Sequence, residues 1–348
     1  MSSTDELADA LEAVIGANDE AATVTSFLDT GFAPLNLALS GRYDGGLPVG
    51  RIVEIFGPPS CGKTAISTKA MIAAQKAGGI AGFNDHERSF AIPLGKDLGL
   101  DDRPGRFVYK TPKTFEESIT IAIKAAELIR GKKLIPVEAP IAWVFDSLAG
   151  MVPKSKMDKA IEDYGMHDNM ALAKATSAAF PALAQFVEEF GICCIFLNQL
   201  KIKPGVVYGD PTTTPGGDAP KYWSSVRVQL GATRITTGKG EDKKMLGQEI
   251  GCRVVKNKVS RPFLTANWRF MFRDDGTGYF DVVGSTVDYL VGIEVIKQAG
   301  AYLVWPDGKK YHRGPLIEKI EKEGLHAELL ALLPARAPAP AEVEAAAA

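Results

Sequence analysis

The chain has 348 residues, of which 46% are hydrophobic and 24% charged, and its formal net charge is −2. This composition is ordinary for a globular protein, and no apolar run approaches the roughly 20 residues that a bilayer span requires, which excludes a membrane-spanning class. The small net charge argues against a globally basic nucleic-acid binder, but it leaves room for a local basic channel, because phosphate contacts depend on where Lys and Arg lie.

The polar, acidic N-terminus lacks the basic and apolar regions of a signal peptide. The four cysteines form no C-x-x-C pair, and the four histidines are scattered, so no metal cluster is visible. We therefore expect a cytoplasmic protein with reduced cysteines.

Residues 3–15 predict a short helix. Ser3 and Glu6 fit a capping box, and the apolar residues that follow share one helical face, namely Leu7, Leu11, Val14 and Ile15. A short helix with one apolar stripe is marginal in water and must dock somewhere. The sequence favours neither of two docking sites, its own domain or a neighbouring subunit, over the other.

From about residue 33, short apolar runs alternate with helical stretches, a rhythm typical of a mostly parallel sheet covered on both faces. We expect strands at 51–56, 79–83, 107–109, 141–146 and 192–197, and helices at 65–78 and 115–130. After residue 220, three strand-like runs follow one another without long helices between them. They predict an antiparallel extension, and the fold class is α/β.

A nucleotide-binding motif lies between the first of these strands and its helix. It runs Gly57-Pro58-Pro59-Ser60-Cys61-Gly62-Lys63-Thr64 and matches G-x-x-x-x-G-K-[ST] in the required context. Such loops cradle phosphates with backbone N–H groups at a helix N-terminus. We expect Lys63 to reach the β- and γ-phosphates and Thr64 to ligate Mg²⁺, so the expected cofactors are ATP and Mg²⁺.

Polar residues follow the tips of three further strands. Asp146 can hold Mg²⁺ through water, although it also suits a helix N-cap. Asp85 or Glu87 can polarise the attacking water, and the residues alone leave that choice open. Gln199 can contact the γ-phosphate, and a long basic segment rich in Gly, Pro and Thr begins directly after it.

The chain resembles the RecA family of DNA strand-exchange recombinases from about residue 28 to about residue 330. The motifs that carry the resemblance occur in the family's order: GRIVEIFGPPSCGKT (50–64), FNDHE (83–87), VFDSLAGMVPK (144–154), NQLKIKPGVVYGDPTTTPGGDAPKYWSSVR (198–227) and VVKNK (254–258). The resemblance implies a RecA-like P-loop NTPase that forms filaments on single-stranded DNA and exchanges strands with duplex DNA, with DNA-dependent ATP hydrolysis. Its divergence suggests a phage-encoded or otherwise distant member.

The resemblance also implies roles for single residues. Glu87 activates water, Gln199 senses the γ-phosphate, Asp146 serves Mg²⁺, and Lys256 and Lys258 are candidates to reach the γ-phosphate of a neighbouring subunit. The implied DNA contacts are Lys201, Lys203, Tyr208, Thr213, Gly216 and Gly217 in the second DNA loop, and Met170 or Met166 in the first. The partners are single- and double-stranded DNA and further copies of the chain, in a helical filament or in closed rings, with no membrane.

We expect four parts, which are an N-terminal helix and linker for subunit docking (1–30), a RecA-like ATPase core (31–278), a small α+β C-terminal domain (279–333) and a disordered Ala/Pro-rich tail (334–348). In the small domain, 287–300 has helical periodicity, 301–311 suggests a hairpin and 315–333 is helical again. The tail carries only Glu342 and Glu344, so an electrostatic role for it is doubtful.

Ala91 and Leu94 stand where the family has an Asp and an aromatic residue near adenine, so nucleotide preference could be relaxed. Two rivals share the ATP site, namely a ring helicase and an accessory paralogue that loads a true recombinase. The C-terminal unit and the TTTPGGDAPK loop favour the recombinase over the helicase, and the presence of both Glu87 and Lys63 argues against the accessory protein.

Overall fold

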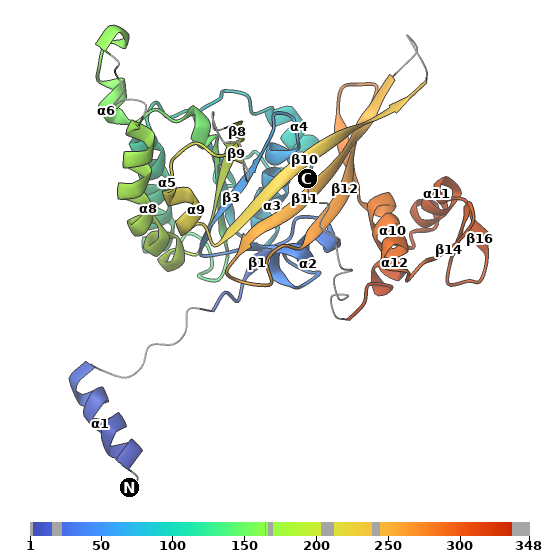
Figure 1. Ribbon diagram of the computed structural model, residues 1–348, viewed down its shortest axis with the longest axis horizontal. Helices are drawn as coiled ribbons and strands as arrows, with labels where there is room; N and C mark the ends of the chain where they lie inside the picture. Colours follow the sequence, from blue (N-terminus) through green and yellow to red (C-terminus); the bar gives the residue numbers. More distant parts are fainter. Residues whose placement is uncertain are drawn as a thin grey trace.

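The computed structural model describes residues 3–15, 23–163, 165, 170–202, 212–238 and 244–335. Within them, nine strands form one sheet in the order β13-β12-β11-β10-β3-β7-β6-β4-β5 (Figure 1). The strands are β3 (Arg51–Gly57), β4 (Ile80–Asp85), β5 (Phe107–Lys110), β6 (Ile141–Asp146), β7 (Ile192–Gln199), β10 (Val226–Thr237), β11 (Lys244–Asn257), β12 (Thr265–Phe272) and β13 (Gly278–Asp281). Neighbours from β10 through β5 are parallel, and β10 through β13 are antiparallel, which confirms the expected mostly parallel sheet with an antiparallel extension.

Helices cover both faces of this sheet. They are α2 (Ala33–Ser40), α3 (Lys63–Lys76) and α4 (Ile92–Asp97), and α5 (Phe115–Gly131), α8 (Ala171–Glu189) and α9 (Ala219–Trp223). Successive strand residues point to opposite faces. Val144 accordingly packs in the cluster beneath α2 and α3, whereas Trp143 and Phe145 pack in the cluster beneath α5 and α8. Because both faces are buried, the central parallel strands are mostly apolar.

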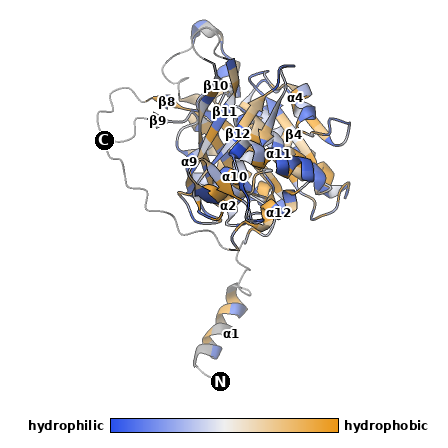
Figure 2. Cartoon of the chain, turned by 90° about the vertical axis from the view of Figure 1, so that its right-hand side faces the viewer, coloured by the Kyte–Doolittle hydropathy of each residue, from blue (hydrophilic) through white to orange (hydrophobic). Residues whose placement is uncertain are grey.

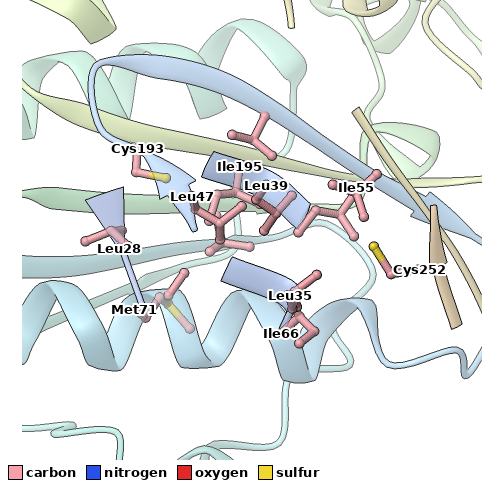
Figure 3. Close-up of a cluster of buried hydrophobic side chains, with 14 of the residues drawn as sticks. Leu28, Leu35, Leu39, Leu47, Ile55, Ile66, Met71, Cys193, Ile195 and Cys252 are labelled. Carbon is pink, nitrogen blue, oxygen red and sulfur yellow. The ribbon is translucent and has the colours of Figure 1, made fainter. Parts of the chain in front are cut away.

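The cluster beneath α2 and α3 fixes the helix that follows the nucleotide-binding motif. Figure 3 shows Leu35 and Leu39 of α2 and Met71 of α3 against Ile55 and Ile195 of the sheet. Each of these side chains is almost fully buried, and burying one contributes about 1.5–3 kcal/mol. This packing holds the start of α3 at a set position relative to the strand ends.

The carboxyl ends of the parallel strands lie along one edge of the sheet. Gly57 ends β3 level with Gln199 of β7, and Asp85 ends β4 level with Asp146 of β6. Four residues singled out from the sequence therefore meet at one edge, the usual ligand position in open α/β sheets.

Shorter elements complete the core. They are β1 (Phe27–Leu28), β2 (Leu47–Pro48), β8 (Lys201–Ile202), β9 (Thr212–Thr213), α6 (Lys154–Met157) and the 3₁₀ turns η1 (Leu148–Gly150) and η2 (Ile161–Asp163). Strand β1 pairs with β2, and β8 pairs with β9, both antiparallel.

A third hydrophobic cluster lies after the sheet. Its elements are α10 (Val282–Gly292), β14 (Lys297–Ala299), β15 (Tyr302–Val304), β16 (Lys310–Tyr311), α11 (Arg313–Glu323) and α12 (His326–Ala331). The helix expected over 287–300 differs from the structure, because α10 begins earlier, where the Asp281 carboxylate accepts from the N–H of Gly284 (2.8 Å), and ends at Gly292. Glu294 then takes φ 61° and the chain turns into β14.

Helix α1 (Ser3–Ile15) stands apart from the sheet and its helices in two perpendicular views (Figures 1 and 2). Its apolar side chains Leu7, Leu11 and Val14 are 59%, 49% and 82% exposed. The stripe predicted from the sequence is therefore not covered by the chain's own core.

No helix in the described ranges is both long and apolar enough to cross a membrane.

Candidate nucleotide-binding and catalytic site

The nucleotide-binding motif forms a tight turn between β3 and α3. Gly62 caps α3 with φ 88°, a backbone conformation that would be strained for a larger residue, and a Cβ at this position would also have to displace Ile250 Cδ1, 2.6 Å away. Lys63 Nζ donates to the carbonyls of Gly57 (3.2 Å) and Pro58 (2.7 Å). The ammonium is thus held inside the loop, where bound phosphates would lie.

Thr64 and Asp146, the two residues expected to serve Mg²⁺, contact each other. Thr64 Oγ1 donates to Asp146 Oδ2 at 3.1 Å, although the residues lie 82 positions apart in the chain. Burial raises the pKa of Asp146 to about 7, with a further contribution from the negative charge of Glu87. A cation beside this carboxylate would relieve both effects.

The structure gives Asp85 and Glu87 different surroundings. Asp85 is 1% exposed, and its Oδ2 accepts from Tyr109 Oη (2.9 Å) and the N–H of Phe90 (3.0 Å). Glu87 is exposed, and its N–H and that of His86 donate to the carbonyl of Asp146. Asp85 therefore fastens the 86–90 turn, and Glu87 presents its carboxylate to the site.

Glu87 lies between two further residues of the edge. Gln199 Nε2 donates to Glu87 Oε1 at 2.9 Å, and Ser147 Oγ donates to the same oxygen. The sequence analysis predicted Gln199 as a site residue because it lies at the tip of a strand, but it assigned no role to Ser147. The amide of Gln199 is thus bound to the carboxylate of Glu87.

A small cavity of about 150 Å³ adjoins Thr64 on the other side of the motif. It is lined by Thr64, Ala65, Thr68, Ser89, Phe90, Ala91, Leu94, Gly95 and Leu98. None of these lining residues is charged. Two of the lining hydroxyls already donate hydrogen bonds, that of Thr64 to Asp146 and that of Thr68 to the carbonyl of Thr64 (2.8 Å).

Lys256 lies away from the nucleotide-binding motif of its own chain. It faces Arg227 in the β10–β11 register, and Arg227 faces Glu54 of β3. Lys256 Nζ donates to the carbonyls of Lys221 (2.6 Å) and Tyr222 (2.7 Å) at the end of α9. Burial, together with the positive charges of Lys258 and Arg227, lowers the pKa of Lys256 to about 8.

Lys258 is exposed and lies farther still from the motif. Its N–H donates to the carbonyl of Ser225, whose own N–H donates to the carbonyl of Ile52 (both 2.8 Å). Ile52 is five residues before Gly57 on β3, or roughly 16 Å at about 3.3 Å per residue. Lys258 lines a cavity of about 540 Å³ at this opposite end, and a lysine there cannot reach the phosphates of its own chain.

The two arms of the second DNA loop pair with each other at their base. Lys201 of β8 is opposite Thr213 of β9, and Lys201 is exposed. Gly216 has φ 94° and is buried, with its carbonyl accepting from Thr176 Oγ1 (2.7 Å), so it anchors the loop to α8. Gly217 follows with φ 71°.

Other residues expected at the DNA loops divide into two groups. Met170, at the start of α8, is 57% exposed. Lys203, Tyr208 and Met166 lie outside the described residues, as do Glu342 and Glu344 of the tail.

A buried polar cluster behind the site was missed by sequence reasoning. It contains Glu54, Asn198 and Arg227, joined by hydrogen bonds. A signal was available, because Glu54 interrupts the apolar run RIVEIF and Asn198 directly follows the apolar run ICCIFL. Charged and amide side chains in buried strands are nearly always paired.

The fold and the site define a class of P-loop nucleotide hydrolase, in which a phosphate-binding loop, a Mg²⁺-type carboxylate and a water-polarising carboxylate meet at one sheet edge. The RecA N-terminal domain family matches residues 10–277 of the chain. Protein RecA of Lactococcus lactis subsp. cremoris (strain MG1363) is 37% identical over 285 residues, which cover 82% of this chain and 68% of that protein. Protein RecA of Cytophaga hutchinsonii is 35% identical over 302 residues (86% and 78%), and that of Clostridioides difficile is 35% identical over 282 residues (81% and 74%).

The chain belongs to the RecA family. It is an ATP-binding strand-exchange recombinase and DNA-dependent ATPase, as the resemblance implied.

Proposed function

We propose that the chain binds ATP with Mg²⁺ at the P-loop, assembles head to tail on single-stranded DNA and pairs that strand with homologous duplex. One observation carries the proposal: Glu87 and Gln199 are hydrogen-bonded at the sheet edge, and the DNA-loop arm β8 begins two residues after Gln199. A change at the phosphates therefore has a short path to the DNA-binding segment.

The residues present fit ATP and a divalent cation. The Lys63 ammonium lies inside the loop, and Thr64 and Asp146 offer a hydroxyl and a carboxylate 3.1 Å apart. Within the described residues, no three His, Cys, Asp or Glu side chains gather as a metal cage. Mg²⁺ suits such a site, because it is usually held by one or two protein oxygens together with substrate phosphates, whose charge it neutralises.

Each residue then has one task in hydrolysis. Glu87 orients the attacking water and accepts its proton. Lys63 leaves its backbone partners to meet the β- and γ-phosphates, and Gln199 exchanges Glu87 for a γ-phosphate oxygen. Lys258, with Lys256 beside it, approaches the phosphates of a neighbouring subunit, since neither can reach those of its own chain.

The DNA contacts are proposed on position and charge. Lys201 and Lys203 neutralise backbone phosphates, Thr213 and the 216–217 turn set the loop's path, and Tyr208 and Met170 lie against bases. Watson–Crick pairing supplies sequence specificity, so the protein needs no base readout of its own.

The proposal includes the four-part organisation expected from the sequence and a location in the cytoplasm. The third hydrophobic cluster supports a small separate domain near 279–333, and the four cysteines, which are buried and unpaired, suit a reducing compartment.

Negative-stain imaging with single-stranded DNA and a non-hydrolysable ATP analogue tests the assembly. We expect helical filaments for the wild type and none for Lys63→Ala, which lacks the main side-chain counter-charge for the phosphates. Closed rings would favour the helicase alternative, and failure to assemble at all would favour the accessory paralogue.

A further inference from the structure

The side chain of Asn198 closes the base of the second DNA loop. It is fully buried, and its two amide hydrogens go to the Pro215 carbonyl (3.0 Å) and to Glu54 Oε1 (2.8 Å). Its oxygen accepts from the N–H of Gln199 (3.0 Å). One side chain thus holds the residue that faces the nucleotide site and the residue that ends the loop.

Glu54 joins this clamp to the neighbouring strands. Its carboxylate is 0% exposed, and while Oε1 takes Asn198, Oε2 accepts from Arg227 Nε at 2.5 Å. A buried carboxylate is costly unless each oxygen has a partner, so the three side chains depend on one another. The guanidinium of Arg227 also lies 4.7 Å from the ring centre of Phe56, on the strand that leads to the P-loop.

The cluster continues to the lysines at the far end of the sheet. Arg227 is the β10 partner of Lys256, whose ammonium is bound to the carbonyls at the end of α9. Helix α9 begins four residues after Pro215. Side-chain hydrogen bonds therefore join Asn198, Glu54 and Arg227, strand pairing joins Arg227 to Lys256, and the chain itself joins α9 to the end of the loop, so these links form one circuit.

We propose that Asn198, Glu54 and Arg227 are positioning residues that couple the Gln199 end of the nucleotide site to the base of the DNA loop and to Lys256. The inference rests on the proposed function and deepens it. The three side chains touch neither phosphate nor DNA. They keep Gln199, Pro215 and Lys256 at fixed positions relative to one another, so that a shift of Gln199 also moves Pro215 and Lys256.

The measurement is the affinity of a labelled single-stranded oligonucleotide, by fluorescence anisotropy, with a non-hydrolysable ATP analogue and with ADP. Salt is fixed, because phosphate contacts make the affinity salt-dependent. Coupling of this kind gives the wild type a gap of about 5–150-fold between the two nucleotides. We expect Asn198→Ala to reduce the gap to within about twofold, as Gln199→Ala should also do.

A matched control is Asn84→Ala. Asn84 is likewise fully buried near the end of a parallel strand, β4, which β6 separates from β7. Its amide is bound to the carbonyl and hydroxyl of Ser118, away from the loop. Thermal unfolding of each variant reports the loss of stability. Asn84→Ala should lose comparable stability and keep the gap.

Glu54→Gln gives a second, independent reading, since it keeps the shape and leaves one of two donors without an acceptor. Combined with Asn198→Ala, it should shrink the gap no further, because both act in one circuit. A full gap in Asn198→Ala, an equal loss in Asn84→Ala or additive losses in the double variant would each overturn the inference. Absence of any gap in the wild type would instead overturn the proposed function.

Discussion

Three acidic residues at the ends of β4 and β6 have different surroundings and therefore different uses. Asp85 accepts hydrogen bonds from Tyr109 and a backbone N–H, Glu87 is exposed, and Asp146 is buried beside Thr64. Nearby carboxyl groups in one site can take distinct roles because their different environments change how readily each is protonated. We propose that Asp85 has a structural role, that Glu87 accepts a proton and that Asp146 binds the cation.

Replacing Glu87 by Gln should separate binding from hydrolysis. The amide keeps the size and hydrogen bonding of the side chain but cannot accept the proton of water. We expect ATP binding to persist, complexes with single-stranded DNA to last longer and turnover to fall by roughly 10²-fold or more. Steady-state turnover and DNA dissociation measure this, and the same result from Asp85→Asn in place of Glu87→Gln would assign the base to Asp85.

Asp146 makes stability depend on pH in an unusual direction. Its pKa is raised from 3.8 to about 7, so between these values the folded chain keeps a proton that the unfolded chain has released. This group therefore disfavours folding more and more as pH rises through that window, up to a full penalty above about 7. Asp146→Asn removes the penalty and also the cation ligand.

Thermal unfolding without nucleotide checks this expectation. Asp146→Asn should raise the melting temperature more at pH 8 than at pH 5, while DNA-stimulated turnover is lost. An equal shift at both values would show that the carboxyl group does not titrate in this range.

At the scale of elements, the cavity between α3 and α4 is where we expect a nucleobase to lie beside the P-loop. Its lining is uncharged, and of its three hydroxyls those of Thr64 and Thr68 are already hydrogen-bonded, which leaves that of Ser89. A pocket with few free polar groups discriminates weakly between similar ligands, whereas one built to hydrogen-bond can discriminate by about 10⁴-fold. We expect kcat/KM for GTP to fall within about 100-fold of that for ATP.

Ala91→Asp should restore a strong preference for ATP, because a carboxylate accepts from the amino group of adenine and repels the carbonyl of guanine. Ala91→Leu, which adds bulk without an acceptor, is the control. A large preference for ATP in the wild type would mean that other groups, such as those of a neighbouring subunit, read the base.

Much of this element pattern could be predicted from the sequence, since apolar runs buried on both faces are unambiguous, and β6 has the expected bounds. The P-loop and the strand-tip residues followed from local motifs. The residues alone left the choice between Asp85 and Glu87 open, and only the resemblance favoured Glu87, because the surroundings of Asp85 depend on Tyr109 of another strand. The helix over 287–300 was wrongly bounded because apolar spacing cannot register the positive φ of Glu294.

At the scale of the whole molecule, two features support assembly with a second copy of the chain. The apolar stripe of α1 is exposed, and Lys258 lies at the opposite end of β3 from the P-loop. An isolated short helix gains its stability from packing, so α1 needs a partner surface. We therefore favour docking on a neighbouring subunit over docking on its own core.

Changing both Leu7 and Leu11 to Glu should prevent this docking. We expect filaments on single-stranded DNA to become short or absent, while binding of a fluorescent ATP analogue is retained. Glu12→Gln, an exposed change on the same helix, should leave filaments intact. Filaments of normal length from the double variant would show that α1 does not hold subunits together.

In the function proposed above, Lys258 completes the site of a neighbouring chain, and this sets a rule for counting active sites. Each chain then carries two half-sites, one at either end of β3, and a complete site exists only where two chains meet. A contact of this head-to-tail kind does not use up its own surfaces, so an open assembly of n chains contains n − 1 complete sites and one unmatched P-loop at its end. A single chain would have no complete site, so ATP hydrolysis would occur only at the junctions between chains. The number of complete sites per chain, and with it the ATP hydrolysed per chain, would rise as assemblies lengthen.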